Sequence, residues 1–155
     1  MLRHGSRTHH SRGQATVEFA LVLIPFLLIL MGIVDLGRVV YVSNGTSEAA
    51  REIARVTSVH PCDPGDCVIG NSPQTLSTIA VQKGMVMGLS DPSSTIAIHC
   101  TDVQNIQLDD GNCQSGSYAR VTVTVRIPLM TGFLVKVVGL PQSFTVSSTS
   151  HVQLP

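Results

Sequence analysis

The stretch RGQATVEFALVLIPFLLILMGIVD, residues 12–35, decides how this chain is organised. It is largely apolar, and it carries a single internal acid, Glu18, while Phe19 to Val34 contains no charge. A charged side chain at the centre of a bilayer costs about 2.5–3.5 kcal/mol on insertion scales and is usually functional. Because about 20 helical residues cross the hydrocarbon core, we expect a single transmembrane helix over about residues 17–40.

The residues before this stretch carry no negative charge. Residues 1–13 contain three arginines and three histidines. Basic flanks stay in the cytoplasm, so we predict a cytoplasmic leader at 1–13 and an extracytoplasmic domain at 59–155. Treating the leader as a disordered tail leaves this orientation unchanged. A secretory signal has a shorter apolar core and a small-residue cleavage site, whereas residues 31–42 continue the helical pattern, so we expect a retained anchor in the cytoplasmic membrane.

Helical periodicity continues beyond the apolar stretch. The apolar positions at helical spacing are Val42, Ala49, Ile53 and Val56. His60-Pro61 should end the helix, because proline restricts the preceding residue to extended backbone. We therefore predict one long helix over residues 14–58, with a kink at Pro25 and Asn44-Gly45 as a possible bend.

The rest of the chain predicts a small α+β domain. Ser72 and Pro73 suit the cap and first turn of a second helix that ends near Gly88. Its expected amphipathic positions are Leu76, Ile79, Ala80, Lys83 and Met87. Alternating side chains predict strands in STIAIHC (94–100), YARVTVTVRI (118–127) and SFTVSSTSHVQL (143–154). The predicted fold class is α+β, with the long helix covering the apolar face of an antiparallel sheet of three or four strands.

Four cysteines, Cys62, Cys67, Cys100 and Cys113, lie on the predicted outer side of the membrane. An even number in that location favours disulfides. Three connectivities are possible and the sequence does not choose among them, although we favour the local pairs Cys62–Cys67 and Cys100–Cys113. The alternative is a zinc site of four thiolates, which is disfavoured because it normally uses two closely spaced pairs.

The N-terminal region resembles a known family. RGQATVEFALVLIPFLLILMGIVDLGRVVYVSNGTSEAAREIAR, residues 12–55, is similar to the start of TadE-like proteins, which are minor pilins (pseudopilins) of the tight-adherence, or Flp type IV, pilus system. The opening RGQATVEFAL, the VDLGR after the apolar run and the AARE run carry this resemblance. A weaker likeness covers VTVTVRIPL and the last predicted strand. The resemblance implies a pilin-like fold and a role in pilus assembly or adhesion.

The resemblance also implies processing and partners. A prepilin peptidase would cut after Gly13, so that the mature chain begins at Gln14 and has Glu18 at its fifth position and the aromatic Phe19 next. The implied partners are that peptidase, other Tad pilus subunits, inner-membrane assembly proteins and the membrane itself. Cleavage frees an α-amine with a reference pKa of about 7.7–8.0, which is suited to pair with Glu18 within one subunit or between subunits. The alternative is that Glu18 only snorkels to the lipid headgroups.

Catalytic and ligand-binding signatures are weak. The aspartates mostly lie beside proline or glycine, where they commonly form turns, and no phosphate loop or nucleophile elbow is present. We expect no enzyme activity, cofactor, metal, small-molecule substrate or nucleic-acid partner. The alternative function is that of an uncleaved, single-pass, envelope-anchored binding protein.

Overall fold

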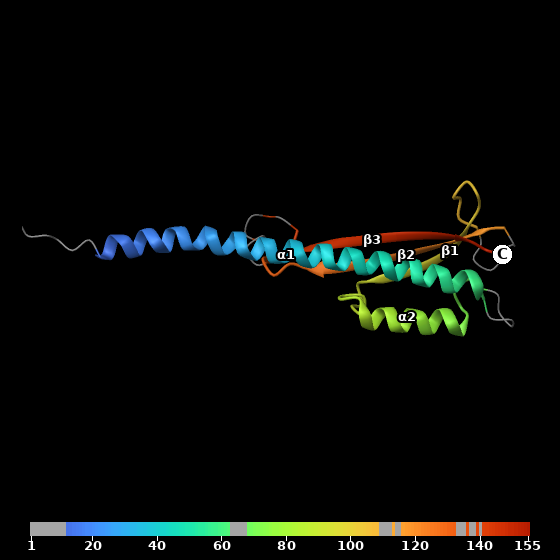
Figure 1. The fold of residues 1–155 in the computed structure, drawn as a ribbon. Coiled ribbons are helices and arrows are strands. Elements are labelled where there is room, and N and C mark those ends of the chain that lie inside the picture. The colour runs from blue at the N-terminus through green and yellow to red at the C-terminus, as the bar shows by residue number, and fades with distance from the viewer. Residues whose placement is uncertain are drawn as a thin grey trace, which may run out of the picture.

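The computed structural model describes residues 12–62, 68–108, 113, 116–132, 136, 139 and 141–155. Its elements are the helices α1 (Arg12–Val59) and α2 (Pro73–Met85), followed by the strands β1 (Thr95–Thr101), β2 (Tyr118–Pro128) and β3 (Ser143–Gln153). The first half of α1 projects as a free rod, and its second half lies along the sheet (Figure 1). This arrangement confirms the predicted α+β fold with one long N-terminal helix.

Helix α1 is continuous over 48 residues and ends one residue before His60. Pro25 lies inside the helix without ending it. The bend considered at Asn44-Gly45 is absent, since both residues are helical. Gly45 instead lies opposite Val86, whose methyl groups would be 3.6 and 3.7 Å from a Cβ at this position. The glycine therefore lies at a contact of α1 with the chain after α2 rather than at a hinge.

The sheet has the order β1-β2-β3, and both pairs are antiparallel. The middle strand directs Val121, Val123 and Val125 toward α1, and all three are fully buried. On the opposite face, Thr122 pairs with Thr149 and Thr124 with Ser147 through hydroxyl contacts of 3.2 Å. The strict alternation in β2 therefore gives one apolar face and one polar face, as its sequence predicts.

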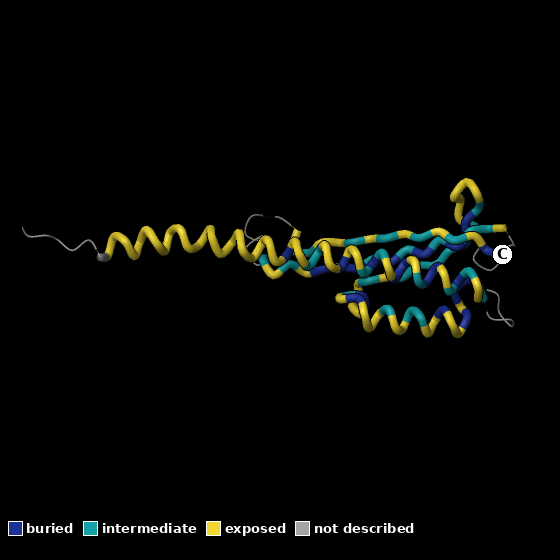
Figure 2. Tube along the Cα trace, viewed as in Figure 1, coloured by how far each residue is buried: buried dark blue, intermediate teal, exposed yellow. Residues whose placement is uncertain are grey.

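The second half of α1 covers the apolar face of the sheet (Figure 2). Ala49, Ala50 and Ala54 are at most 2% exposed, and these small side chains let the helix approach the strands closely. Ile53 fills the centre of the contact and is completely buried. Ser47 adds a 3.1 Å hydroxyl contact to Ser148 on β3. Burial of this apolar stripe, worth about 25 cal/mol per Å², holds the helix on the sheet.

Helix α2 begins as predicted, but fewer of its side chains are buried than predicted. Ser72 caps it by accepting a hydrogen bond from the Thr75 amide at 3.2 Å. The expected amphipathic face is largely wrong: Ile79 is half-buried, whereas Leu76, Ala80, Lys83 and Met87 are exposed. The helix ends at Met85 rather than near Gly88, because Val86 is extended. Val86 and Leu89, which follow the helix, enter the core in place of the helix face.

Cys100 and Cys113 are joined by a disulfide with Cα atoms 5.8 Å apart, the pairing that the sequence analysis favoured. Cys100 is buried in a second apolar cluster with Ile69, Ala119 and Leu154. Cys62 is also disulfide-bonded, whereas Cys67 lies outside the described residues. Within the described part of the chain, no group of three or more metal-ligating side chains comes together.

Candidate assembly and anchoring site

The rod formed by the start of α1 is apolar and uncovered. All 22 residues from Gly13 to Val34 are exposed, and burial begins at Asp35 (Figure 2). An 18-residue window of the helix reaches a mean hydropathy of 2.7. At 1.5 Å per residue, the exposed segment is about 33 Å long, close to the hydrocarbon thickness of about 30 Å. The helix therefore fits a single-pass membrane anchor.

The residues implicated in processing and assembly lie at the free end of this rod. Gly13, Gln14, Glu18 and Phe19 are all exposed and remote from the sheet (Figure 1). The Gln14 side chain donates a hydrogen bond from Nε2 to Glu18 Oε1 at 3.1 Å, across one helical turn. The structure thus brings Gln14 and Glu18 together on one face, and Phe19, the next residue, is 66% exposed.

Gly13 has no packing role in the fold. A Cβ at this position would meet nothing within 4 Å, and glycine costs roughly 0.5–1 kcal/mol relative to alanine inside a helix. The bond from Gly13 to Gln14 lies in the first turn of α1, which begins at Arg12. The first four amides of a helix lack intrahelical partners, so unwinding this turn breaks few hydrogen bonds.

Asp35 marks the point where α1 joins the domain, a role that no pattern in the sequence predicts. Its carboxylate accepts hydrogen bonds from the backbone amides of Met130 at 3.0 Å and Thr131 at 3.1 Å, and from the Thr131 hydroxyl at 2.7 Å. Arg38 lies one turn along the helix, with its Nη1 3.8 Å from Asp35 Oδ1. Asp35 is only 5% exposed, so every one of these donors compensates a carboxylate removed from water.

The same contacts govern the protonation of Asp35, which lies beyond the exposed apolar segment. Burial by itself raises the pKa of this carboxyl, but the hydrogen bonds from Met130 and Thr131 and the charge of Arg38 oppose it. The net result is a pKa below the ordinary value for aspartate. The carboxylate is therefore ionised in the native state at neutral pH and acts as an acceptor only.

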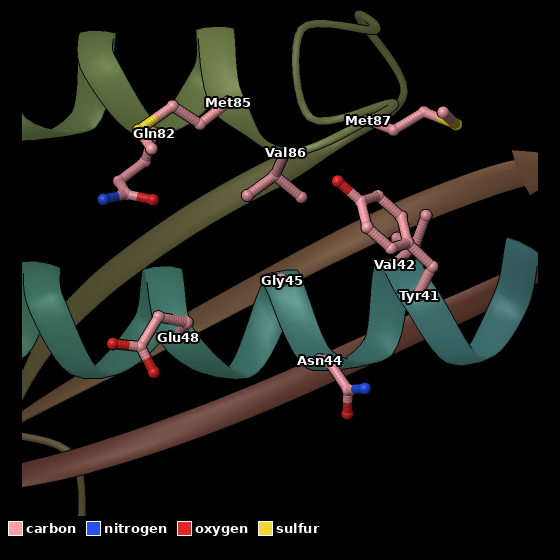
Figure 3. A pocket seen from close by; sticks show the side chains of 9 residues that line it. All are labelled: Tyr41, Val42, Asn44, Gly45, Glu48, Gln82, Met85, Val86 and Met87. Atoms are coloured by element: carbon pink, nitrogen blue, oxygen red, sulfur yellow. The ribbon is translucent and has the colours of Figure 1, made fainter.

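A hollow of about 380 Å³ lies between α1 and the end of α2. Tyr41 and Glu48 approach it from α1, while Met85 and Met87 approach it from the other side (Figure 3). Val86 points toward Gly45 between these two groups (Figure 3). The lining is largely apolar, and Glu48 is the charged residue among the described residues that form it.

The fold and the exposed rod define the class of protein. It has one apolar N-terminal helix, and a small α+β domain packs on the second half of that helix. Residues 13–55 match the family model described as TadE-like protein. The match confirms, for these residues, the resemblance seen in the sequence. No curated protein and no solved structure matches the chain.

Proposed function

We propose that this protein is a minor pilin, or pseudopilin, of a bacterial Tad (Flp) pilus. A prepilin peptidase cuts it after Gly13, and the mature protein takes part in pilus assembly or adhesion. The observation that carries this proposal is the exposed Glu18 in an otherwise uncharged apolar rod, five residues after an exposed glycine and within the TadE-like match. Nothing in the described fold requires either residue, so an external role accounts for both.

The geometry of the first turns suits assembly chemistry. After cleavage, Gln14 carries the new α-amine, and Glu18 lies one turn further along. A carboxylate near a helix N-terminus is favourable because the helix dipole is positive there. The 3.1 Å contact from the Gln14 side chain already shows that Glu18 faces this end of the helix. Between subunits, the amine of one chain and Glu18 of its neighbour would fix the axial register, and such ionic pairs favour specificity more than stability.

The anchor that we propose is slightly shifted from the range expected from sequence. A span over residues 17–40 would place Asp35 and Arg38, with their domain contacts, inside the bilayer. We place the span at residues 13–34 because all of these residues are exposed and domain contacts begin at Asp35. The basic leader then lies in the cytoplasm, and the α+β domain faces the extracytoplasmic side.

Cleavage is tested by the intact mass and N-terminal sequence of the membrane-extracted protein, expressed with and without the peptidase. We expect loss of residues 1–13 only when the peptidase is present. Gly13→Leu should remain uncut, whereas Gly37→Leu should be cut normally, since both positions have open space around them. An uncut wild-type chain in the presence of active peptidase would contradict the proposal and favour the uncleaved, anchored binding protein.

A further inference from the structure

An apolar hollow of about 670 Å³ opens where α1 meets the membrane end of the sheet. Its apolar walls come from Gly32, Leu36 and Val39 on α1 and from Leu129, Pro141 and Phe144 around the β2–β3 connection. The polar members of the lining are Asp35 and Thr131, which are hydrogen-bonded to each other. Both polar residues are therefore satisfied by hydrogen bonds, and the rest of the lining is apolar.

Two large apolar side chains of the lining, Leu36 and Phe144, are exposed, as is Met130, which lies in the chain between the lining residues Leu129 and Thr131. Leu36 and Met130 are each 64% exposed, and Phe144 is 48% exposed. On α1, this surface is continuous with the exposed segment of residues 13–34. The surfaces of soluble proteins rarely carry a large contiguous apolar patch without a partner. The neighbouring segment of α1, residues 13–34, already requires an apolar environment.

The position of the hollow along α1 matches the edge of a bilayer. With the span ending at Val34, Leu36 and Val39 lie about 3 and 8 Å further along the helix axis. The headgroup layer on each side of the hydrocarbon core is roughly 5–7 Å thick. The hollow thus lies where acyl chains give way to headgroups.

The charges near the hollow suit a phosphate. Arg38 lies between Leu36 and Val39 on α1, and its side chain is 26% exposed. The acid of this region, Asp35, already accepts three hydrogen bonds from Met130 and Thr131. An arginine on the stretch of α1 that lines an apolar hollow is complementary to a phospholipid, whose phosphate would share Arg38 with Asp35.

We propose that this hollow takes an acyl chain of a phospholipid from the extracytoplasmic leaflet, with the phosphate near Arg38, and that Met130 and Phe144 lie in the membrane interface. The domain is then seated on the membrane rather than held above it. This inference rests on the membrane anchor of the proposed function, and it adds a lipid contact made by the domain itself.

The test uses tryptophan fluorescence, because the chain contains no tryptophan. Full-length Phe144→Trp and, independently, Met130→Trp are reconstituted into phosphatidylcholine–phosphatidylglycerol vesicles. A fraction of the lipid is brominated either near the carbonyl end or near the methyl end of the acyl chain. Phe26→Trp reports the span, and Val103→Trp, at a site 76% exposed in the loop after β1, serves as the aqueous control.

We expect Phe144→Trp and Met130→Trp to show blue-shifted emission that is quenched more by bromine near the carbonyl end. Phe26→Trp should be quenched by brominated lipid as well, while Val103→Trp should emit as in water and remain unquenched. Quenching of Phe26→Trp without quenching at 130 or 144 would overturn the lipid contact and leave the anchor intact. Blue-shifted but unquenched emission at 130 and 144 would mean that protein covers the hollow, which also overturns the proposal. An unquenched Phe26→Trp would instead contradict the anchor itself.

Discussion

Asp35 and Thr131 are joined by two hydrogen bonds, although 96 residues separate them in the chain. The Thr131 amide and hydroxyl both donate to Asp35 Oδ2, at 3.1 and 2.7 Å. Asp35 is the first buried residue of α1, and Thr131 lies just after β2. This pair therefore fixes the connection between β2 and β3 to α1 at the point where we propose that the helix leaves the bilayer.

Replacing Asp35 by asparagine should destabilise the domain by about 1.5–3 kcal/mol, the range for hydrogen bonds to charged groups. The asparagine keeps one acceptor oxygen but turns an amide group toward donors that need acceptors. The measurement is urea unfolding of the detergent-solubilised protein, followed by pulse proteolysis. Asp91→Asn is the matched control, because Asp91 is an exposed aspartate in a turn that asparagine also forms. Equal stability of the two variants would contradict the role given to Asp35.

The advantage of wild-type protein over Asp35→Asn should shrink in acid. The contacts of Asp35 hold its pKa below the ordinary value in the native state, so the unfolded chain binds the proton more readily. The stabilisation is complete above the unfolded pKa of about 3.9 and is lost as the pH falls through the lower native pKa. Unfolding free energies of both proteins from pH 7 down to pH 3 test this, and a difference that grows toward low pH would contradict it.

The contrast between β2 and Asp35 shows what the sequence alone could predict. Alternation in β2 depends on local pattern, so the sequence predicts this strand and its one apolar face, which Val121, Val123 and Val125 form. An acid directly after an apolar run, as in VDLGR, is a visible signal in the sequence. Its partners could not be found, because Met130 and Thr131 meet Asp35 only through the tertiary packing of α1 on the sheet.

Helix α2 illustrates the opposite failure, in which a local pattern was overridden. Its cap at Ser72 and its start at Pro73 follow from residue chemistry and were predicted. Its apolar spacing predicts a buried face, yet Val86 and Leu89, which follow the helix, lie in the core instead. Gly88, with a φ of +84°, turns the chain so that Leu89 enters the core. Hydrophobic periodicity does not show whether a short helix or the segment after it will fill the core.

Two glycines should respond to alanine in opposite ways. Gly45→Ala should stabilise the protein by roughly 0.5–1 kcal/mol, because it removes a glycine from a helix interior and adds a Cβ at ordinary contact distance from Val86. Gly70→Ala should destabilise it, since Gly70 has a φ of +79° and its Cβ would lie 2.8 Å from Ile98 Cδ1. Urea unfolding of both variants measures these changes, and destabilisation by Gly45→Ala would contradict the contact between α1 and Val86.

Ile53→Ala should cost about 2–5 kcal/mol, the usual range for truncating a buried isoleucine. Ile53 is completely buried between α1 and the sheet. Val81→Ala is the control, because Val81 is 57% exposed on α2 and its truncation should change stability by no more than about 0.5 kcal/mol. Comparable losses in the two variants would show that α1 does not supply the main cover of the sheet.

Glu18→Ala and Glu18→Gln should both be processed normally but fail to enter the pilus or its base complex. Glutamine retains an oxygen that can accept from the Gln14 side chain, yet it removes the charge that we propose pairs with the freed amine. Failure of both variants therefore identifies the charge, rather than the 3.1 Å hydrogen bond, as the requirement. The measurements are intact mass, for processing, and immunoblots of sheared pili and membrane complexes, for incorporation. Val22→Ala, one turn further along the exposed rod, should be incorporated normally. Normal incorporation of Glu18→Ala would instead show that the carboxylate only reaches the lipid headgroups, and incorporation of Glu18→Gln alone would make the hydrogen bond, not the charge, the requirement.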